Sequence, residues 1–101
     1  MSFPKTYRLV TSPRAERDLE HILRYTSDTW GESQLAVYQQ LLDNAIRVLR
    51  QNPTLGHRSA DLSKTHLVYP VGSHVIVYRV LGDLIGIVRV LHQRMSVSLH
   101  V

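Results

Sequence analysis

The chain has 101 residues, of which 44% are hydrophobic, so we expect a single folded domain over residues 1–101 rather than a disordered segment. It has no cysteine, which excludes disulfides and thiolate metal sites and fits a reducing cytoplasm. The net charge of +4 favours an acidic partner, either nucleic acid or an acidic protein, and the apolar runs are too short to span a membrane.

The N-terminal half predicts a short strand followed by two helices. Residues 7–10 read as the strand. Ser12 can cap the free amides of a helix start, and Pro13 suits the first helical position because its missing N–H is not needed there. Gly31 can end this helix in a left-handed conformation, and a second amphipathic helix is expected over 32–51. The short joint folds the two helices into a hairpin.

The C-terminal half predicts a sheet. After a polar connection over 52–64, strands are expected over 66–69, 74–81 and 84–92, where Val, Ile and Tyr are frequent. Gly82-Asp83 allows a tight two-residue hairpin, with glycine supplying the unusual backbone angle. We therefore expect an α+β fold of order β-α-α-β-β-β, in which the helical hairpin packs on a mostly antiparallel, curved sheet.

A two-residue loop predicts that Tyr78 lies opposite Ile87 and that Ser73 lies opposite His92. Both faces of the hairpin are then apolar. One face would hold Val75, Val77, Val88 and Val90, and the other Ile76, Tyr78, Ile85, Ile87 and Leu91. The helices can cover one of these faces, so the other face suggests a segment from a partner.

Three segments of the chain resemble a known family. They are Arg24-Tyr25-Thr26 with Trp30-Gly31, Gln34 and Tyr38; Asn52-Pro53-Thr54-Leu55-Gly56-His57-Arg58; and Val77-Tyr78-Arg79-Val80 followed by Arg89-Val90-Leu91-His92-Gln93-Arg94-Met95. In this order and spacing the chain resembles the RelE/ParE superfamily of toxins from bacterial type II toxin–antitoxin systems. The Trp-Gly joint and the Leu-His-x-Arg-Met ending look most like the ParE branch.

The resemblance implies a toxin that inhibits DNA gyrase by direct binding, without catalytic residues of its own. Members of the RelE branch are instead ribosome-dependent ribonucleases. In both branches a small antitoxin neutralises the toxin by wrapping its C-terminal segment around it. We therefore expect a ParD-like antitoxin, a toxin–antitoxin hetero-oligomer and DNA gyrase as partners. We expect no membrane, no sequence-specific nucleic acid and no cofactor.

Two sets of residues are candidates for these contacts. The target-contact set is Arg58, His92, Arg94 and Met95, chosen because such residues gather at the polar end of the last strand. The antitoxin-binding set is Tyr25, Trp30 and Arg79. The antitoxin is expected over the open apolar surface near Trp30 and the strand edge.

Two other functions stay open. A metal-free ribonuclease needs an acid, a base and cations for the phosphate, and His74, Arg79, His92 and Arg94 could supply them. Against this, Val75 stands where RelE-like toxins carry an arginine, and no tyrosine follows in the tail. A third possibility is a degenerate member that only binds its antitoxin and represses an operon with it.

Structural roles also account for several of these residues. His92 could cap the strand end, and Trp30 could pack at the helix joint. Arg79 and Arg89 could extend their stems over the sheet and reach water. The pairs His57 and His66, and His92 and His100, lack further ligands at metal-ligand spacing, so we expect no metal site.

Overall fold

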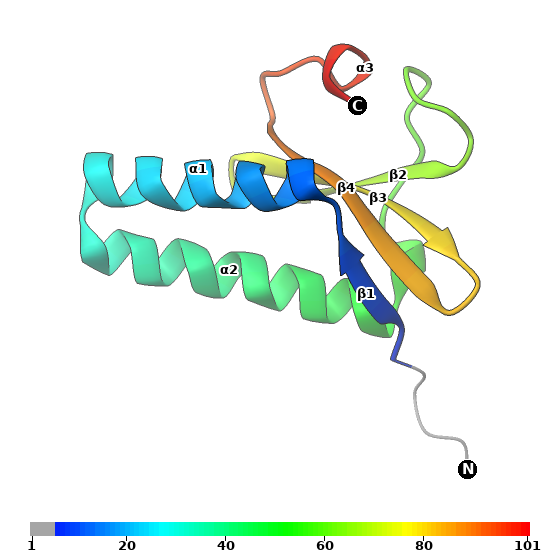
Figure 1. Cartoon of the computed structure of the whole chain (residues 1–101), viewed down its shortest axis with the longest axis horizontal. Coiled ribbons are helices and arrows are strands. Elements are labelled where there is room, and N and C mark those ends of the chain that lie inside the picture. Colours follow the sequence, from blue (N-terminus) through cyan, green and yellow to red (C-terminus); the bar gives the residue numbers. More distant parts are fainter. Residues whose placement is uncertain (1–5) are drawn as a thin grey trace.

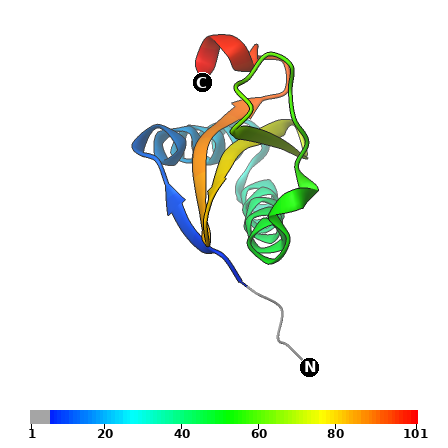
Figure 2. The same cartoon turned by 90° about the vertical axis from the view of Figure 1, so that its right-hand side faces the viewer.

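The computed structural model describes residues 6–101 and has the predicted α+β class, with two helices packed on a four-stranded mixed sheet (Figures 1 and 2). The elements in chain order are β1 (Arg8–Thr11), α1 (Pro13–Trp30), α2 (Glu32–Gln51), the 3-10 turn η1 (Pro53–Leu55), β2 (His66–Val71), β3 (His74–Leu81), β4 (Leu84–His92) and α3 (Val97–His100). The boundaries of α2, β3 and β4 agree with those predicted, and β1 lies one residue later than expected.

The helical hairpin begins and turns as its sequence predicts. The Ser12 hydroxyl accepts a hydrogen bond from the Ala15 N–H at 3.0 Å, and Pro13 occupies the first turn of α1. Gly31 joins α1 to α2 with a φ of 89°, a backbone angle that favours glycine. Within residues 6–101, neither these helices nor α3 is long and apolar enough to cross a bilayer.

The sheet has the order β1-β4-β3-β2, with β1 parallel to β4 and the other pairs antiparallel. Strand β2 runs through Pro70 to Val71, whereas the sequence suggested that Pro70 closes it. The difference arises because β2 is an edge strand, where a residue without an N–H need not break the ladder.

The predicted hairpin register is correct near the turn, where Tyr78 lies opposite Ile87. It is wrong further along, because His74 rather than Ser73 lies opposite His92. The ladder is irregular between these two points, so the partners of β3 shift by one residue along β4.

A β-bulge at Val88 causes the shift, because the ladder skips this residue. The Ser12 hydroxyl donates to the Val88 carbonyl at 2.8 Å, which gives the bulge a side-chain partner. An extra residue reverses the alternation of every side chain beyond it. Val90 therefore joins the core beneath the helices and Leu91 does not, the reverse of the predicted faces.

The two faces of the sheet are covered to different extents. The helix face carries the core, which includes Ala15, Leu42, Ala45, Leu49, Val71, Ile76, Tyr78, Ile85, Ile87 and Val90. On the outer face Val77 is buried, whereas Val10 and Leu81 near the hairpin turn are 54% and 49% exposed. The β2 loop (residues 56–65) and the C-terminal arm (residues 93–101) lie on the side of the sheet away from α2 (Figures 1 and 2). The open part of the second face is thus confined to the hairpin end.

Candidate functional site

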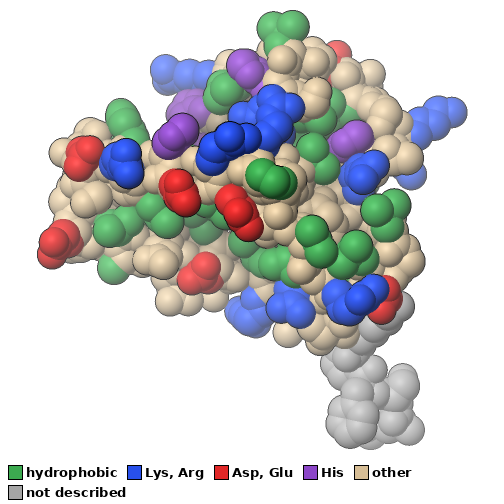
Figure 3. Space-filling view, viewed as in Figure 1, with side chains coloured by type: hydrophobic (Ala, Val, Ile, Leu, Met, Phe, Trp, Pro, Cys, Tyr) green, Lys and Arg blue, Asp and Glu red, His purple; other side chains and the backbone are tan. Residues whose placement is uncertain are grey.

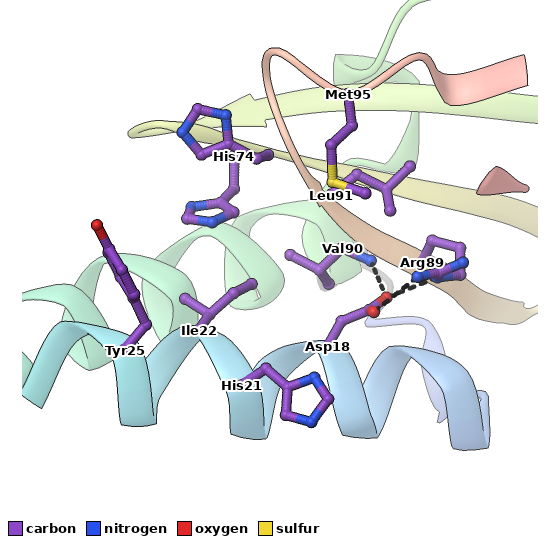
Figure 4. Close-up of a pocket in the computed structure, with 10 residues that line it drawn as sticks. Asp18, His21, Ile22, Tyr25, His74, Arg89, Val90, Leu91 and Met95 are labelled. Atoms are coloured by element: carbon purple, nitrogen blue, oxygen red, sulfur yellow. Dashed lines mark hydrogen bonds and ion pairs between the residues drawn. The ribbon is translucent and has the colours of Figure 1, made fainter. Parts of the chain in front are cut away.

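A cleft lies between α1 and the ends of β3 and β4. It consists of two hollows of about 430 and 420 Å³, and Tyr25, His74 and His92 line both. Met95 of the C-terminal arm borders the first hollow and Trp30 of α1 borders the second. Figure 4 shows the first hollow, with Tyr25 projecting from α1 and Met95 reaching down from the arm. We call both hollows together the α1–β4 cleft.

The side chains of Tyr38, His74 and His92 form a connected group in this cleft. The Tyr38 hydroxyl is hydrogen-bonded to Nδ1 of His74 and accepts the Ser73 N–H at 3.2 Å. The rings of His74 and His92 meet edge to face, with centroids 5.3 Å apart. Burial raises the pKa of Tyr38, while burial and the neighbouring His92 lower the pKa of His74. Both shifts favour the neutral forms, so at neutral pH the hydroxyl keeps its proton and the imidazole is uncharged.

His92 also shapes the turn that leaves β4. Its Nδ1 accepts the Arg94 N–H at 3.1 Å, and its carbonyl accepts the Met95 N–H at 2.9 Å. The Ser73 carbonyl accepts the Gln93 N–H at 2.8 Å. The expected capping role of His92 is thus present, in addition to its place in the cleft. The structure brings His92, Arg94 and Met95 together, as the sequence predicted.

Two aromatic side chains of α1 stand open to solvent beside these residues. Trp30 is 65% exposed and Tyr25 is 66% exposed. The alternative that Trp30 packs at the helix joint is therefore wrong. Large exposed aromatic rings around a concave surface are typical of partner-binding sites.

Arg58 and Arg79 lie away from the cleft. Arg58 is exposed on the β2 loop, where its guanidinium is hydrogen-bonded to the Lys64 carbonyl, and β3 separates β2 from β4. Arg79 lies opposite His66 at a separate hollow of about 460 Å³ on the outer face. Burial and this arginine lower the pKa of His66.

The four residues proposed as a ribonuclease set are therefore divided. His74 packs against Tyr38 of α2, on the helix side of the sheet, and His92 contacts His74 there. Arg79 lines the outer hollow near the hairpin turn. The structure does not bring this arginine to the two histidines.

Sequence reasoning missed one charged pair at the edge of the cleft. Arg89 Nε and Nη2 donate to the two carboxylate oxygens of Asp18 at 2.7 and 2.8 Å, and both side chains are largely buried (Figure 4). Burial alone would raise the pKa of Asp18, but hydrogen bonds from Arg89 and from the Val90 N–H outweigh it and lower that pKa. The expectation that Arg89 reaches water is wrong. In the sequence, the only sign that Arg89 pairs with a carboxylate was its place as an isolated arginine in an apolar strand.

Cationic side chains gather beside this pair on the surface. Figure 3 shows Lys, Arg and His side chains together where α1 meets the C-terminal arm, with acidic side chains along α1 below them. Arg14 belongs to this region, because its Nη2 donates to the His100 carbonyl of the arm at 3.2 Å. This end of the molecule offers a positively charged border to the cleft.

Comparison with known proteins matches nearly all of the chain to one family. Residues 9–97 match the family model described as the ParE toxin of the type II toxin–antitoxin system parDE. The chain is 38% identical over 96 residues to Toxin ParE1 of Caulobacter vibrioides, covering 95% of this chain and 97% of that protein. It is 40% identical over 92 residues to Toxin ParE1 of Mycobacterium tuberculosis, covering 90% and 94%.

Solved structures show the same fold at lower sequence identity. A chain of the chromosomal ParDE system from P. aeruginosa matches with a TM-score of 0.73 and 18% identity over 87% of this chain and 97% of that one. A chain of the RelBE2 toxin–antitoxin complex from Mycobacterium tuberculosis matches with a TM-score of 0.62 and 19% identity, over 87% and 99%. From the family model and the curated relatives, the chain belongs to the ParE toxin family of type II toxin–antitoxin systems.

Proposed function

We propose that this toxin inhibits DNA gyrase by direct binding, without chemistry of its own, and is neutralised by a ParD-like antitoxin. Membership of the ParE family supports the gyrase target, because the sequence resembles the branch that acts on gyrase. The structural neighbours come from ParDE and RelBE toxin–antitoxin systems, which supports an antitoxin partner.

The observation that carries the proposal is the fixed group His92, Arg94 and Met95 beside two exposed aromatic rings. Backbone hydrogen bonds to His92 hold the turn before any partner arrives. Arginine, methionine and aromatic residues are enriched in protein interfaces, and preformed contacts lower the ordering cost of association. We infer that Arg94 and Met95 touch gyrase, with His92 holding their turn. Arg58 contributes only if the gyrase surface extends over the β2 loop.

The antitoxin uses two surfaces in this proposal. Tyr25 and Trp30 line the α1–β4 cleft, whereas Arg79 lies at the outer hollow. One segment that touches all three must extend from the α1–α2 joint, where Trp30 lies, to the hairpin end of the sheet, where Arg79 lies (Figure 1). Because His92 and Met95 line the same cleft, the antitoxin and gyrase compete for it.

The rival function is cleavage of mRNA on the ribosome. It is less favoured because Arg79 lies on a different face from His74 and His92, so the four candidate groups do not meet. In a degenerate toxin that only binds its antitoxin, Trp30 would still contact the antitoxin, whereas Arg94 would have no target to contact.

The test adds purified toxin to a gyrase supercoiling assay and to translating ribosomes carrying mRNA. We expect inhibited supercoiling and intact mRNA, and addition of the antitoxin should restore supercoiling. Arg94→Ala should weaken inhibition while antitoxin binding persists. Arg47→Ala, an exposed arginine on α2 outside the cleft, is the matched control. Cleaved mRNA with normal supercoiling would overturn the proposal.

A further inference from the structure

The C-terminal arm is tied down at its distal end by an ion pair that joins two other elements. Asp18 comes from α1 and Arg89 from β4, and their side chains are only 13% and 12% exposed. The two parallel hydrogen bonds of 2.7 and 2.8 Å form the bidentate geometry that an arginine and a carboxylate prefer. Asp18 also accepts the Val90 N–H at 3.0 Å, so its orientation is fixed from two sides.

The third nitrogen of the same guanidinium holds the arm. Arg89 Nη1 donates to the His100 carbonyl at 2.6 Å, and Arg14 Nη2 donates to the same oxygen at 3.2 Å. Two cations therefore meet one carbonyl at the C-terminal end of α3, where positive charge is favourable. We call Asp18, Arg89 and the His100 carbonyl the clasp.

Apolar packing holds the arm only in part. Val97 and Val101 are half-buried, but Leu99, the largest apolar residue of α3, is 80% exposed. The proximal end of the arm is tied separately, through the bonds of Gln93, Arg94 and Met95 to Ser73 and His92. The arm is thus attached at both ends, and Arg94 and Met95 belong to the proximal attachment, which the clasp supports from the distal end.

We propose that Asp18 is a positioning residue that holds the C-terminal arm through Arg89, so that Arg94 and Met95 are preformed for target contact. The last clause rests on the gyrase function proposed above. Without Asp18, Arg89 loses the partner that directs its Nη1 at the arm, and the distal half of the arm can leave β4. A mobile arm must be ordered again on binding, which weakens association with the target.

The arm can be observed directly, because the chain contains no cysteine. A nitroxide label on Leu99→Cys reports the motion of α3 by electron paramagnetic resonance. Adding Asp18→Asn should change the spectrum from restricted to mobile. Adding Asp43→Asn, an exposed carboxylate on α2, should leave it unchanged. Arg14→Gln, which removes one of the two donors to His100 and spares the ion pair, should give an intermediate spectrum.

Activity is then measured on the unlabelled proteins. Asp18→Asn should raise the toxin concentration needed to inhibit gyrase by about tenfold or more, because the arm must be reordered on binding. Antitoxin affinity, anchored on Tyr25 and Trp30 of α1, should fall less. Should Asp18→Asn fail to fold, the double variant Asp18→Leu/Arg89→Met removes the clasp without leaving a buried charge.

Two results would overturn the proposal. An unchanged label spectrum in folded Asp18→Asn, or in the double variant, would show that the clasp does not hold the arm. A mobile arm with full gyrase inhibition would show that its position does not matter for the target. If the wild-type toxin does not inhibit gyrase at all, the proposed function fails, and the label spectra still decide whether the clasp holds the arm.

Discussion

Each of the two hollows of the α1–β4 cleft is similar in size to the hollow on the outer sheet face, but the two regions differ in organisation. The cleft hollows measure about 430 and 420 Å³, and the outer hollow about 460 Å³. In the cleft, hydrogen bonds link Tyr38 to His74 and Asp18 to Arg89, so its polar groups are preorganised. The outer hollow combines exposed aliphatic side chains with Arg79, His66 and Ser12, whose hydroxyl donates to the Val88 backbone. The comparison teaches that hydrogen bonds between polar side chains of different elements, rather than the volume of each hollow, distinguish the surface we assign to specific recognition.

The largest expected effect concerns the cleft. Trp30→Ala should reduce antitoxin affinity by about 2–4 kcal/mol, because tryptophan is enriched among the residues that contribute most of the binding energy at protein interfaces. Titration calorimetry measures the dissociation constant. Val37→Ala, another exposed apolar side chain but on α2, should leave it unchanged. Equal losses of antitoxin affinity for both variants would show that the cleft is not the main antitoxin contact.

The next prediction compares Gly56, which lies against a core side chain, with Gly86, which lines the outer hollow. A Cβ at Gly56 would lie 2.2 Å from the Tyr78 hydroxyl, which accepts the Gly56 N–H and donates to the Pro53 carbonyl. Gly56→Ala should therefore lower the free energy of unfolding by about 1–3 kcal/mol, as overpacking does. A Cβ at Gly86, which lines the outer hollow, meets nothing within 4 Å, so Gly86→Ala should not destabilise the protein. Urea denaturation measures both, and a destabilised Gly86→Ala would contradict an open outer face.

A smaller effect is expected from pH. Burial and His92 lower the pKa of His74 below its ordinary 6.5 in the folded protein. As pH falls through 6.5, the unfolded chain binds the proton first, so stability decreases until the lowered pKa is passed. Melting temperatures between pH 8 and pH 5 should therefore fall less in His74→Gln than in the wild type. A residual slope is expected in the variant, because the pKa of His66 is lowered too. Identical slopes would mean that the cleft histidines do not form the described group.

The smallest effect concerns the outer hollow. Arg79→Ala should cost about 0.2–1 kcal/mol of antitoxin affinity, because a cation at the border of an interface is screened by water and salt. The loss should shrink further as ionic strength rises. Titration at two salt concentrations measures this. A loss as large as that of Trp30→Ala would move the main antitoxin contact from the cleft to the sheet.

Parts of the site could be predicted from sequence, for a local reason. His92, Arg94 and Met95 follow one another on the chain, so a single strand end was enough to gather them. Arg58 was expected at the polar end of the last strand and Arg79 was grouped with Tyr25 and Trp30, but the structure places both arginines outside the cleft. The pairing of Asp18 with Arg89 spans 71 residues and left no local pattern to find.

By itself, the sequence determined the start of α1 and the bounds of α2, β3 and β4, because a capping serine, a turn glycine and a run of β-branched residues act on their immediate neighbours. Only the tertiary structure decided the register beyond Val88, the exposure of Trp30 and the partner of Arg89. These three features depend on which helices and strands pack against one another in three dimensions. The unpaired Val88 exchanged the sheet faces of Val90 and Leu91, and the hydrophobic pattern of the strand gives no sign of such a residue.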